Sequence, residues 1–235
     1  MVKIITLNDS YREEKEMNRK IYRCHYRGQL KNTLDEDKLM ETLDECRKNA
    51  ELLITEEKVM TAALYYHGEM LFLYYESISE EICPDTFMGP MHDLLEKWPT
   101  KSGLSDWALM YHIYYHAIPE GEEDWRRPVS PELRRGRIAY LKKDNMFQYV
   151  YHHVAIVNEG LLAGDKYQSI ALHEDILFSY FEEPKTITNI RRDLSQESET
   201  IKAWLYVVPE DHFSPIPGSN GGNFLFIPAY FALGQ

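Results

Sequence analysis

The sequence predicts an α+β fold made of two halves that share one order of elements. Three observations support this prediction: alternating, β-rich segments, amphipathic helical segments between them, and a hairpin that occurs twice. In both halves the predicted order is strand, helix, hairpin, helix and strand. The segments are 21–30, 37–53, 59–78, 85–98 and 105–118 in the first half, and 137–143, 146–163, 166–183, part of 186–208 and 223–233 in the second.

Capping residues, turn residues and the periodicity of apolar positions identify the individual elements. Residues 37–53 carry apolar residues at 39, 43, 46, 50 and 53, which is the spacing of an amphipathic helix after a cap at Asp35. Gly68 separates two strand-like runs, and Glu174 takes the same place in the second half. Asp144 is the expected cap of the helix that begins at Met146.

The two hairpins resemble each other residue by residue, as YYHGEMLFLYYE and ALHEDILFSYFE. We therefore predict an internal duplication with a period of roughly 110 residues, too long for a solenoid. The predicted parts are an N-terminal extension (1–20), a first domain (21–118), a charged linker (119–136) and a second domain (137–235).

Each βαββαβ unit predicts a four-stranded antiparallel sheet with both helices on one face, the ferredoxin-like arrangement. The other face of such a sheet needs a cover, and a tandem copy can supply one. We therefore expect the two sheets to pack against each other as an α/β barrel of the dimeric type, with the helices outside.

Composition narrows the possible partners. A formal net charge of -12 argues against nucleic acid, and the three cysteines indicate neither a disulfide framework nor a zinc site. No segment approaches the roughly 20 apolar residues of a membrane span. A soluble, cytoplasmic protein that does not bind membranes is expected.

The segment MFQYVYHHVAI (146–156) contains two adjacent histidines. On a helical wheel an apolar stripe is expected through Met146, Val150, Val154, Val157 and Leu161. Tyr149 and His153 then lie at one edge of this stripe, and His152 points towards solvent. Adjacent histidines diverge on a helix, so a metal site is disfavoured, while a proton-transferring Tyr149–His153 pair and a packed core histidine both stay open.

The second half resembles the L-rhamnose mutarotases, which are ferredoxin-like proteins that dimerise into an α/β barrel. The resemblance lies in Tyr149, His153, Ile156 and Glu159, at the spacing of that family's first helix. It implies a carbohydrate mutarotase, an isomerase that interconverts the anomers of a monosaccharide or related sugar without a cofactor or metal, and that could form a homodimer. It implies that His153 is the catalytic acid/base and that Tyr149 contacts the sugar.

The family's two sugar-binding tryptophans correspond here to Ala203 and Trp204, and Tyr167 is the nearest counterpart of a further sugar-binding tyrosine. In the first half Glu41 and Glu45 stand where Tyr and His would be, so that copy lacks the motif. Two alternatives stay open: a barrel monooxygenase or haem-type enzyme, and a non-catalytic barrel that binds a small molecule.

Other polar residues are further candidates for a site or for core packing. His112 and His116 lie four apart in a predicted strand, where they would share a face, and with Tyr114, His25 and Tyr65 they could line the barrel or simply pack on the sheet. His67 and His173 are expected to be solvated at the two hairpin turns. Five arginines suggest either a solvated linker or a site for an anionic ligand: Arg126, Arg127, Arg134, Arg135 and Arg137.

Overall fold

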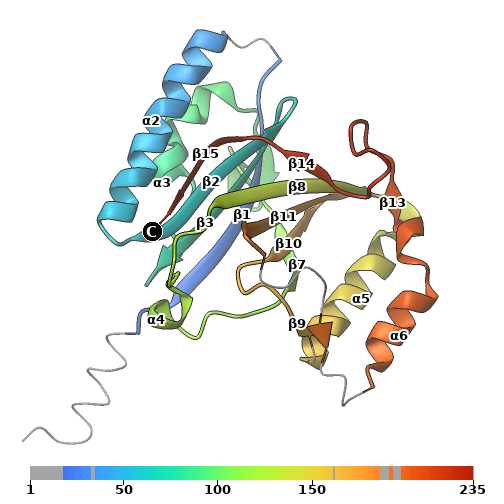
Figure 1. The fold of residues 1–235 in the computed structure, drawn as a ribbon. Coiled ribbons are helices and arrows are strands. Elements are labelled where there is room, and N and C mark those ends of the chain that lie inside the picture. Colours follow the sequence, from blue (N-terminus) through green and yellow to red (C-terminus); the bar gives the residue numbers. More distant parts are fainter. Residues whose placement is uncertain (1–17, 33–34, 161, 186–190, 193–196, 235) are drawn as a thin grey trace, which may run out of the picture.

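The computed structural model describes residues 18–32, 35–160, 162–185, 191–192 and 197–234. Two antiparallel sheets lie between two helical layers, with α2 and α3 on one side of the strands and α5 and α6 on the other (Figure 1). Most of the expected N-terminal extension, Leu161 and most of 186–196 lie outside the described residues. The prediction of a mixed α+β fold with antiparallel sheets is confirmed.

The first sheet has the strand order β15-β2-β3-β1-β6. Its strands are β1 (Ile21–Gln29), β2 (Val59–His67), β3 (Met70–Ile78), β6 (Ala108–Leu109) and β15 (Ala229–Gly234). Its helical layer contains α2 (Glu36–Thr55), α3 (Asp85–Met88) and the 3-10 helix η1 (Gly89–Leu94). Asp35 caps α2 as predicted, by accepting hydrogen bonds from the backbone of Asp37 and Lys38.

The second sheet has the order β13-β8-β11-β10-β7, and β14 also pairs with β8. Its strands are β7 (Tyr111–Tyr115), β8 (Leu133–Leu141), β10 (Ser169–His173), β11 (Ile176–Glu183), β13 (Phe213–Ser214) and β14 (Leu225–Ile227). Its helices are α5 (Met146–Glu159) and α6 (Glu199–Tyr206), with the 3-10 turns η2 (Lys143–Asn145) and η3 (Pro209–His212). Asp144 lies within η2 and Asn145 takes the N-cap position of α5, so the expected Asp144 cap is wrong.

The remaining elements are short. A small hairpin is formed by β4 (Trp98–Thr100) and β5 (Gly103–Ser105), and β9 (Leu162–Ala163) pairs with β12 (Arg191–Arg192). A single turn, α4 (Glu122–Trp125), lies in the connecting segment, the name used here for residues 116–132 between β7 and β8. This segment includes most of the predicted linker.

At two places the chain passes from one sheet to the other between consecutive strands. β6 pairs with β1 of the first sheet, and β7, which follows after Met110, pairs with β10 of the second. In the same way β14 pairs with β8 of the second sheet, and β15, after Pro228, pairs with β2 of the first. The predicted strands 105–118 and 223–233 are therefore each divided between two sheets.

Successive side chains of β3 and β11 point to opposite faces of their sheets, so each sheet has one face towards the helices and one inner face towards the other sheet. Phe72 and Tyr74 point to the inner face and contact the equivalent Phe178 and Tyr180, with ring centroids 5.3 Å apart for the phenylalanines and 3.7 Å for the tyrosines. Side chains one position along, such as Leu73 and Leu177, pack against the helices instead. Aromatic rings from both sheets thus meet in the inner core.

The predicted positions of three histidines, His112, His116 and His173, need correction. His112 contacts His25 on the inner face, whereas His116 bonds to Tyr114, which packs towards α5. A bulge at Ile113 shifts the register between β7 and β10, so His112 and His116 do not share a face. His173 is half-buried against Trp98 and is not simply solvated.

Gly136 in β8 is needed for the approach of the two sheets. A Cβ atom at this position would lie 2.6 Å from Cγ of Tyr65 on the opposite sheet. Tyr65 is fully buried and cannot move outwards. We expect Gly136→Ala to lower the free energy of unfolding by about 1–3 kcal/mol, as overpacked cores do. Chemical denaturation measures this, and an unchanged midpoint would show that the Tyr65 ring can be displaced at no cost.

No helix among the described residues is long and apolar enough to cross a membrane.

Candidate functional site

Three of the four residues expected at a site do meet. The Tyr149 and His153 rings on α5 stack with their centroids 3.8 Å apart, and Trp204 on α6 lies edge-on to His153 at 4.8 Å. The cluster is closed from the sheet side by Tyr114, at 5.4 Å from His153. The Tyr-x-x-x-His spacing therefore predicted a real contact between side chains.

The surroundings of His153 are those of a packed core residue. Its Nδ1–H donates to the Tyr149 carbonyl oxygen at 2.9 Å, and both side chains are buried. Burial lowers the pKa of His153 to about 4, although the bond to Tyr149 acts in the opposite direction. An imidazole in this position is neutral at pH 7, which favours the core reading over the proton-transferring one.

The orientation of α5 differs from the expected one. Its buried residues are Tyr149, His152, His153 and Ile156, while Val154 is 38% exposed. His152 is only 7% exposed, with its ring 5.6 Å from Trp204, so the expectation that it faces solvent is wrong. The reason is α6, which covers the side of α5 that would otherwise be open.

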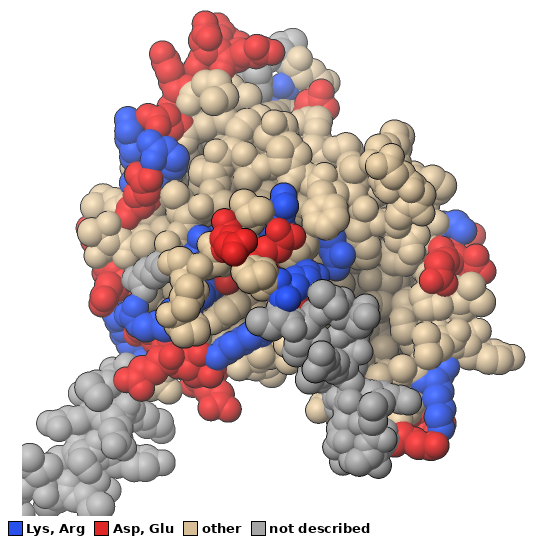
Figure 2. Space-filling model, viewed as in Figure 1, with Lys and Arg blue, Asp and Glu red and all other residues tan. Residues whose placement is uncertain are grey.

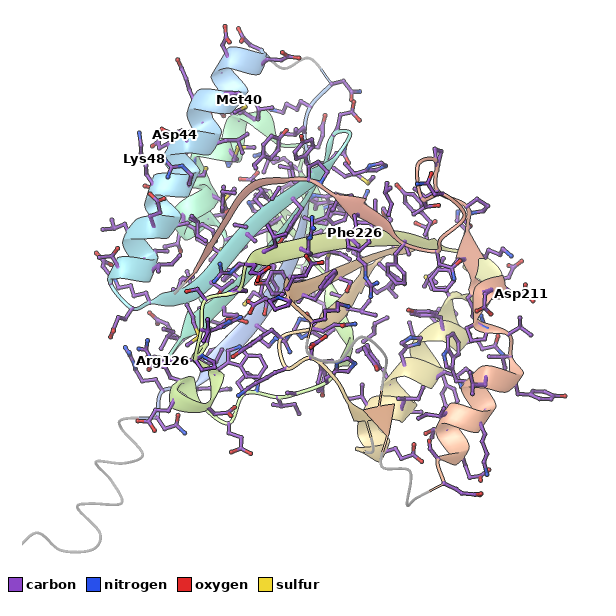
Figure 3. All side chains as sticks on the ribbon, viewed as in Figure 1. Met40, Asp44, Lys48, Arg126, Asp211 and Phe226 are labelled. Carbon is purple, nitrogen blue, oxygen red and sulfur yellow. The ribbon has the colours of Figure 1, made fainter. Side chains whose placement is uncertain are left out.

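Tyr167 lies in a different place. It packs with residues between the two sheets and beside the connecting segment, and its hydroxyl donates to the Arg126 carbonyl oxygen at 3.3 Å. Figure 3 shows Arg126 beside α4, on the opposite side of the view from Asp211, which lies by α6. The structure therefore does not bring Tyr167 to the His153 cluster.

Arg127 lies against Tyr167 and is the centre of a buried ionic network. Its guanidinium carbon is 3.8 Å from the Tyr167 ring centroid. Its nitrogens donate to Glu76 at 2.5 and 3.0 Å and to Glu182 at 2.8 Å. The exposed fractions of the three charged side chains are 1%, 0% and 7%. Arg127 is therefore not part of a solvated linker, which corrects that expectation.

The network holds its charges in a fixed ionic state. Burial alone would raise the pKa of Glu76, but the charge and hydrogen bonds of Arg127 outweigh it, and the pKa lies below its usual value. Burial would lower the pKa of Arg127, and the two carboxylates more than offset this, so its pKa is raised. The Glu76 carboxylate and the Arg127 guanidinium therefore stay ionised together at neutral pH.

A cavity of about 640 Å³, called the mouth pocket here, opens beside this network. One wall is the connecting segment and the other is the start and end of the β10–β11 hairpin. Its lining includes Arg127, Pro128, Pro131, Tyr167, Glu182 and Pro184. Figure 2 shows acidic and basic side chains next to each other around the connecting segment, where the rim of the pocket lies.

A sequence signal for this network existed. Glu76 and Glu182 each stand two residues after a tyrosine on the inner face of their hairpin, and a carboxylate there needs a buried cation. Pairs of basic residues occur at several places in the chain, among them 126–127, 134–135 and 191–192. The repeated Tyr-x-Glu pattern indicates a buried cation, but no sequence pattern says which of these pairs supplies it.

A second polar chain crosses the inner core. His112 Nε2 lies 2.5 Å from His25 Nδ1, and His25 Nε2 lies 3.1 Å from the Ser169 hydroxyl. His25 and Ser169 are buried. Burial lowers the pKa of His25 and lowers the pKa of His112 to about 3. Within the described residues no group of three or more His, Cys, Asp or Glu side chains could hold a metal ion.

No protein-family model and no curated protein matches this chain. Two solved structures, each named "putative monooxygenase", match over most of it. The one from Lactobacillus acidophilus NCFM is 8% identical, with a TM-score of 0.43, 91% of this chain covered and 96% of the other. The one from Fusobacterium nucleatum subsp. nucleatum ATCC 25586 is 9% identical, with a TM-score of 0.40. The match covers 92% of this chain and 95% of the other.

A third structure, of an anthrone oxidase-like protein, is 8% identical with a TM-score of 0.36, and covers 91% of this chain and 94% of its own. The expected membership of the L-rhamnose mutarotases is wrong, because the matching structures are named as monooxygenases or as anthrone oxidase-like. The assignment to isomerases of carbohydrate metabolism fails with it.

Proposed function

We propose that this protein binds a small organic molecule in the mouth pocket, between two ferredoxin-like halves that face each other as an α/β barrel. The barrel interpretation is supported by the strand orders. β6-β1-β3-β2 and β13-β8-β11-β10 follow the same pattern of fourth, first, third and second strand. It is also supported by the contact between equivalent residues of the two hairpins, Tyr74 with Tyr180 and Phe72 with Phe178.

The observation that carries the ligand proposal is the mouth pocket itself. Its volume of about 640 Å³ is in the range of small-molecule sites, and it opens at one end of the interface between the halves. Prolines, Val129 and the Tyr167 ring give it apolar walls, and Lys166, Asp124 and Glu183 lie among its polar groups. Such a lining suits a compound with a flat apolar part and polar ends.

The His153 cluster is not part of this proposal. Its three rings fill the space between α5, α6 and the second sheet, and the cavity beside α5 is lined by residues such as His116, Val157 and Asn158. His153 is not among that lining. We interpret Tyr149, His153 and Trp204 as the core that attaches both helices to the sheet.

Ligand-detected NMR with a set of aromatic fragments tests the proposal. We expect fragments that bind the wild type to bind Tyr167→Ala about tenfold more weakly, equivalent to about 1.4 kcal/mol. The matched control is Tyr151→Ala, since Tyr151 is exposed on the outer side of α5 and should leave binding unchanged. If no fragment binds, or if both variants weaken binding equally, the mouth pocket is not a ligand site.

A further inference from the structure

The carboxylates of Glu76 and Glu182, here called the carboxylate pair, are held in place by hydroxyl groups of the two sheets. The Tyr74 hydroxyl donates to Glu76 at 2.5 Å, and the Tyr180 hydroxyl donates to Glu182 at 2.7 Å. Trp125 adds an indole N–H donor to Glu76 at 2.9 Å. Such hydrogen bonds fix the orientation of both carboxylates, so the pair is a prepared cation site.

The cation in this site is a guanidinium. Four of its five N–H groups point at the carboxylate pair, and the fifth donates to the Met60 sulfur at 3.3 Å. Glu76 accepts two bonds in a fork from the terminal nitrogens of Arg127. Glu182 accepts from the third nitrogen, Nε, at 3.2 Å and shares one terminal nitrogen. The Tyr167 ring covers the face of the guanidinium plane. An ammonium group could match neither the fork nor the stacked face.

The cation comes from a different part of the chain than the carboxylates do. Glu76 and Glu182 belong to β3 and β11, whereas Arg127 belongs to the connecting segment, which has only the single turn α4. Next to Arg127 the segment is open to solvent, with Val129 79% exposed. The mouth pocket begins at Arg127, Tyr167 and Glu182, so a ligand with its head in the site has room for its tail.

We infer that the carboxylate pair and Tyr167 form a recognition site for guanidinium and amidinium compounds, which Arg127 fills as an internal occupant until such a ligand replaces it. The placement of the ligand's tail in the mouth pocket rests on the proposed function. The recognition of the head group does not, because it depends only on the carboxylate pair and the Tyr167 ring.

The first experiment removes the occupant. Arg127→Ala deletes the atoms of an ethylguanidinium ion, so this ion is the probe, with ethylammonium and urea as controls for charge and shape. We expect ethylguanidinium to raise the melting temperature of Arg127→Ala in a saturable way, by about 3–6 °C at tenfold excess over its dissociation constant. Ethylammonium and urea should give no saturable rise.

The matched control is Arg47→Ala. Arg47 also bonds two carboxylates, Asp44 and Glu51, but on the exposed outer face of α2. Ethylguanidinium should not raise the melting temperature of the Arg47→Ala variant. An equal response of both variants, or of ethylguanidinium and ethylammonium, would overturn the inference. If Arg127→Ala does not fold, Arg127→Ala/Glu182→Gln leaves one uncompensated carboxylate in place of two and is tested with the same probes.

The second experiment uses the wild type and separates this inference from the proposed function. Phenylethylguanidinium should bind the wild type more tightly than phenylethylammonium does. It should bind the wild type more weakly than it binds Arg127→Ala, because in the wild type Arg127 has to be displaced. Fragment binding without any preference for the guanidinium head would refute the inference and leave the proposed function standing. If phenylethylguanidinium does not bind the wild type, the inference is overturned even if Arg127→Ala is rescued, and the aromatic fragments still decide the proposed function separately.

Discussion

Substitution of Arg127 by alanine is expected to lower the free energy of unfolding by about 3–5 kcal/mol. The change leaves Glu76 and Glu182 buried without their main counter-ion, since the remaining Arg134 only approaches Glu182 to 3.9 Å, and each carboxylate belongs to a different sheet. Their repulsion therefore acts across the interface between the two halves. Urea denaturation followed by tryptophan fluorescence measures the loss, and a decrease below about 1 kcal/mol would contradict it.

A triple variant distinguishes repulsion from lost packing. Arg127→Met combined with Glu76→Gln and Glu182→Gln removes all three charges while keeping side chains of similar volume. Replacing buried ion pairs by well-packed apolar residues of similar volume is often neutral or stabilising, and the two glutamines here also keep an acceptor for the Tyr74 and Tyr180 hydroxyls. We therefore expect the triple variant to recover most of the stability that Arg127→Ala loses. Arg47→Ala, on the surface of α2, should give no measurable change.

Acidification is expected to destabilise the wild type between pH 6.5 and pH 4, partly through His153. The pKa of His153 falls from 6.5 in the unfolded chain to about 4 in the folded protein, because the folded state buries it. The unfolded state therefore binds more protons in this window. The stability due to neutral His153 is complete above pH 6.5 and is lost as the pH falls to 4. The loss is about 3 kcal/mol, or about 1.4 kcal/mol per pH unit.

The comparison with His153→Gln isolates this contribution. Glutamine can still donate to the Tyr149 carbonyl but does not titrate, so its unfolding free energy should fall less steeply with pH by about 1 kcal/mol per unit between pH 6 and 4.5. Phe147→Gln, at an exposed position of the same helix, should keep the wild-type slope. Parallel slopes for the wild type and His153→Gln would show that His153 is protonated in the folded state.

The elements with a clear period were predictable from the sequence. Alternation and the turn residues located both hairpins, and Gly68 and Glu174 indeed adopt positive φ angles at the turns, 57° and 54°. The spacing of Tyr149 and His153 predicted their contact, and the tryptophan of the second helix joined them. Each of these depends on local geometry, which a sequence pattern records directly.

What the sequence could not supply depends on contacts between distant segments. The rotation of α5 follows from α6, which covers His152, and a helical wheel contains no information about a neighbouring helix. The bulge at Ile113 reverses the face of His116, although alternation predicts a regular strand. The position of Arg127 depends on two carboxylates 51 and 55 residues away. The division into domains at 118 and 137 stays a prediction.

The crossing strands have a consequence for synthesis of the protein. β2, which begins at Val59, is paired on one side by β15, whose last residue is Gly234. The edge of the first sheet thus stays open while the ribosome makes some 160 further residues, which takes on the order of ten seconds or more. During that interval a nascent chain exposes an apolar strand edge, so we expect the first half to depend on chaperones until β15 has emerged.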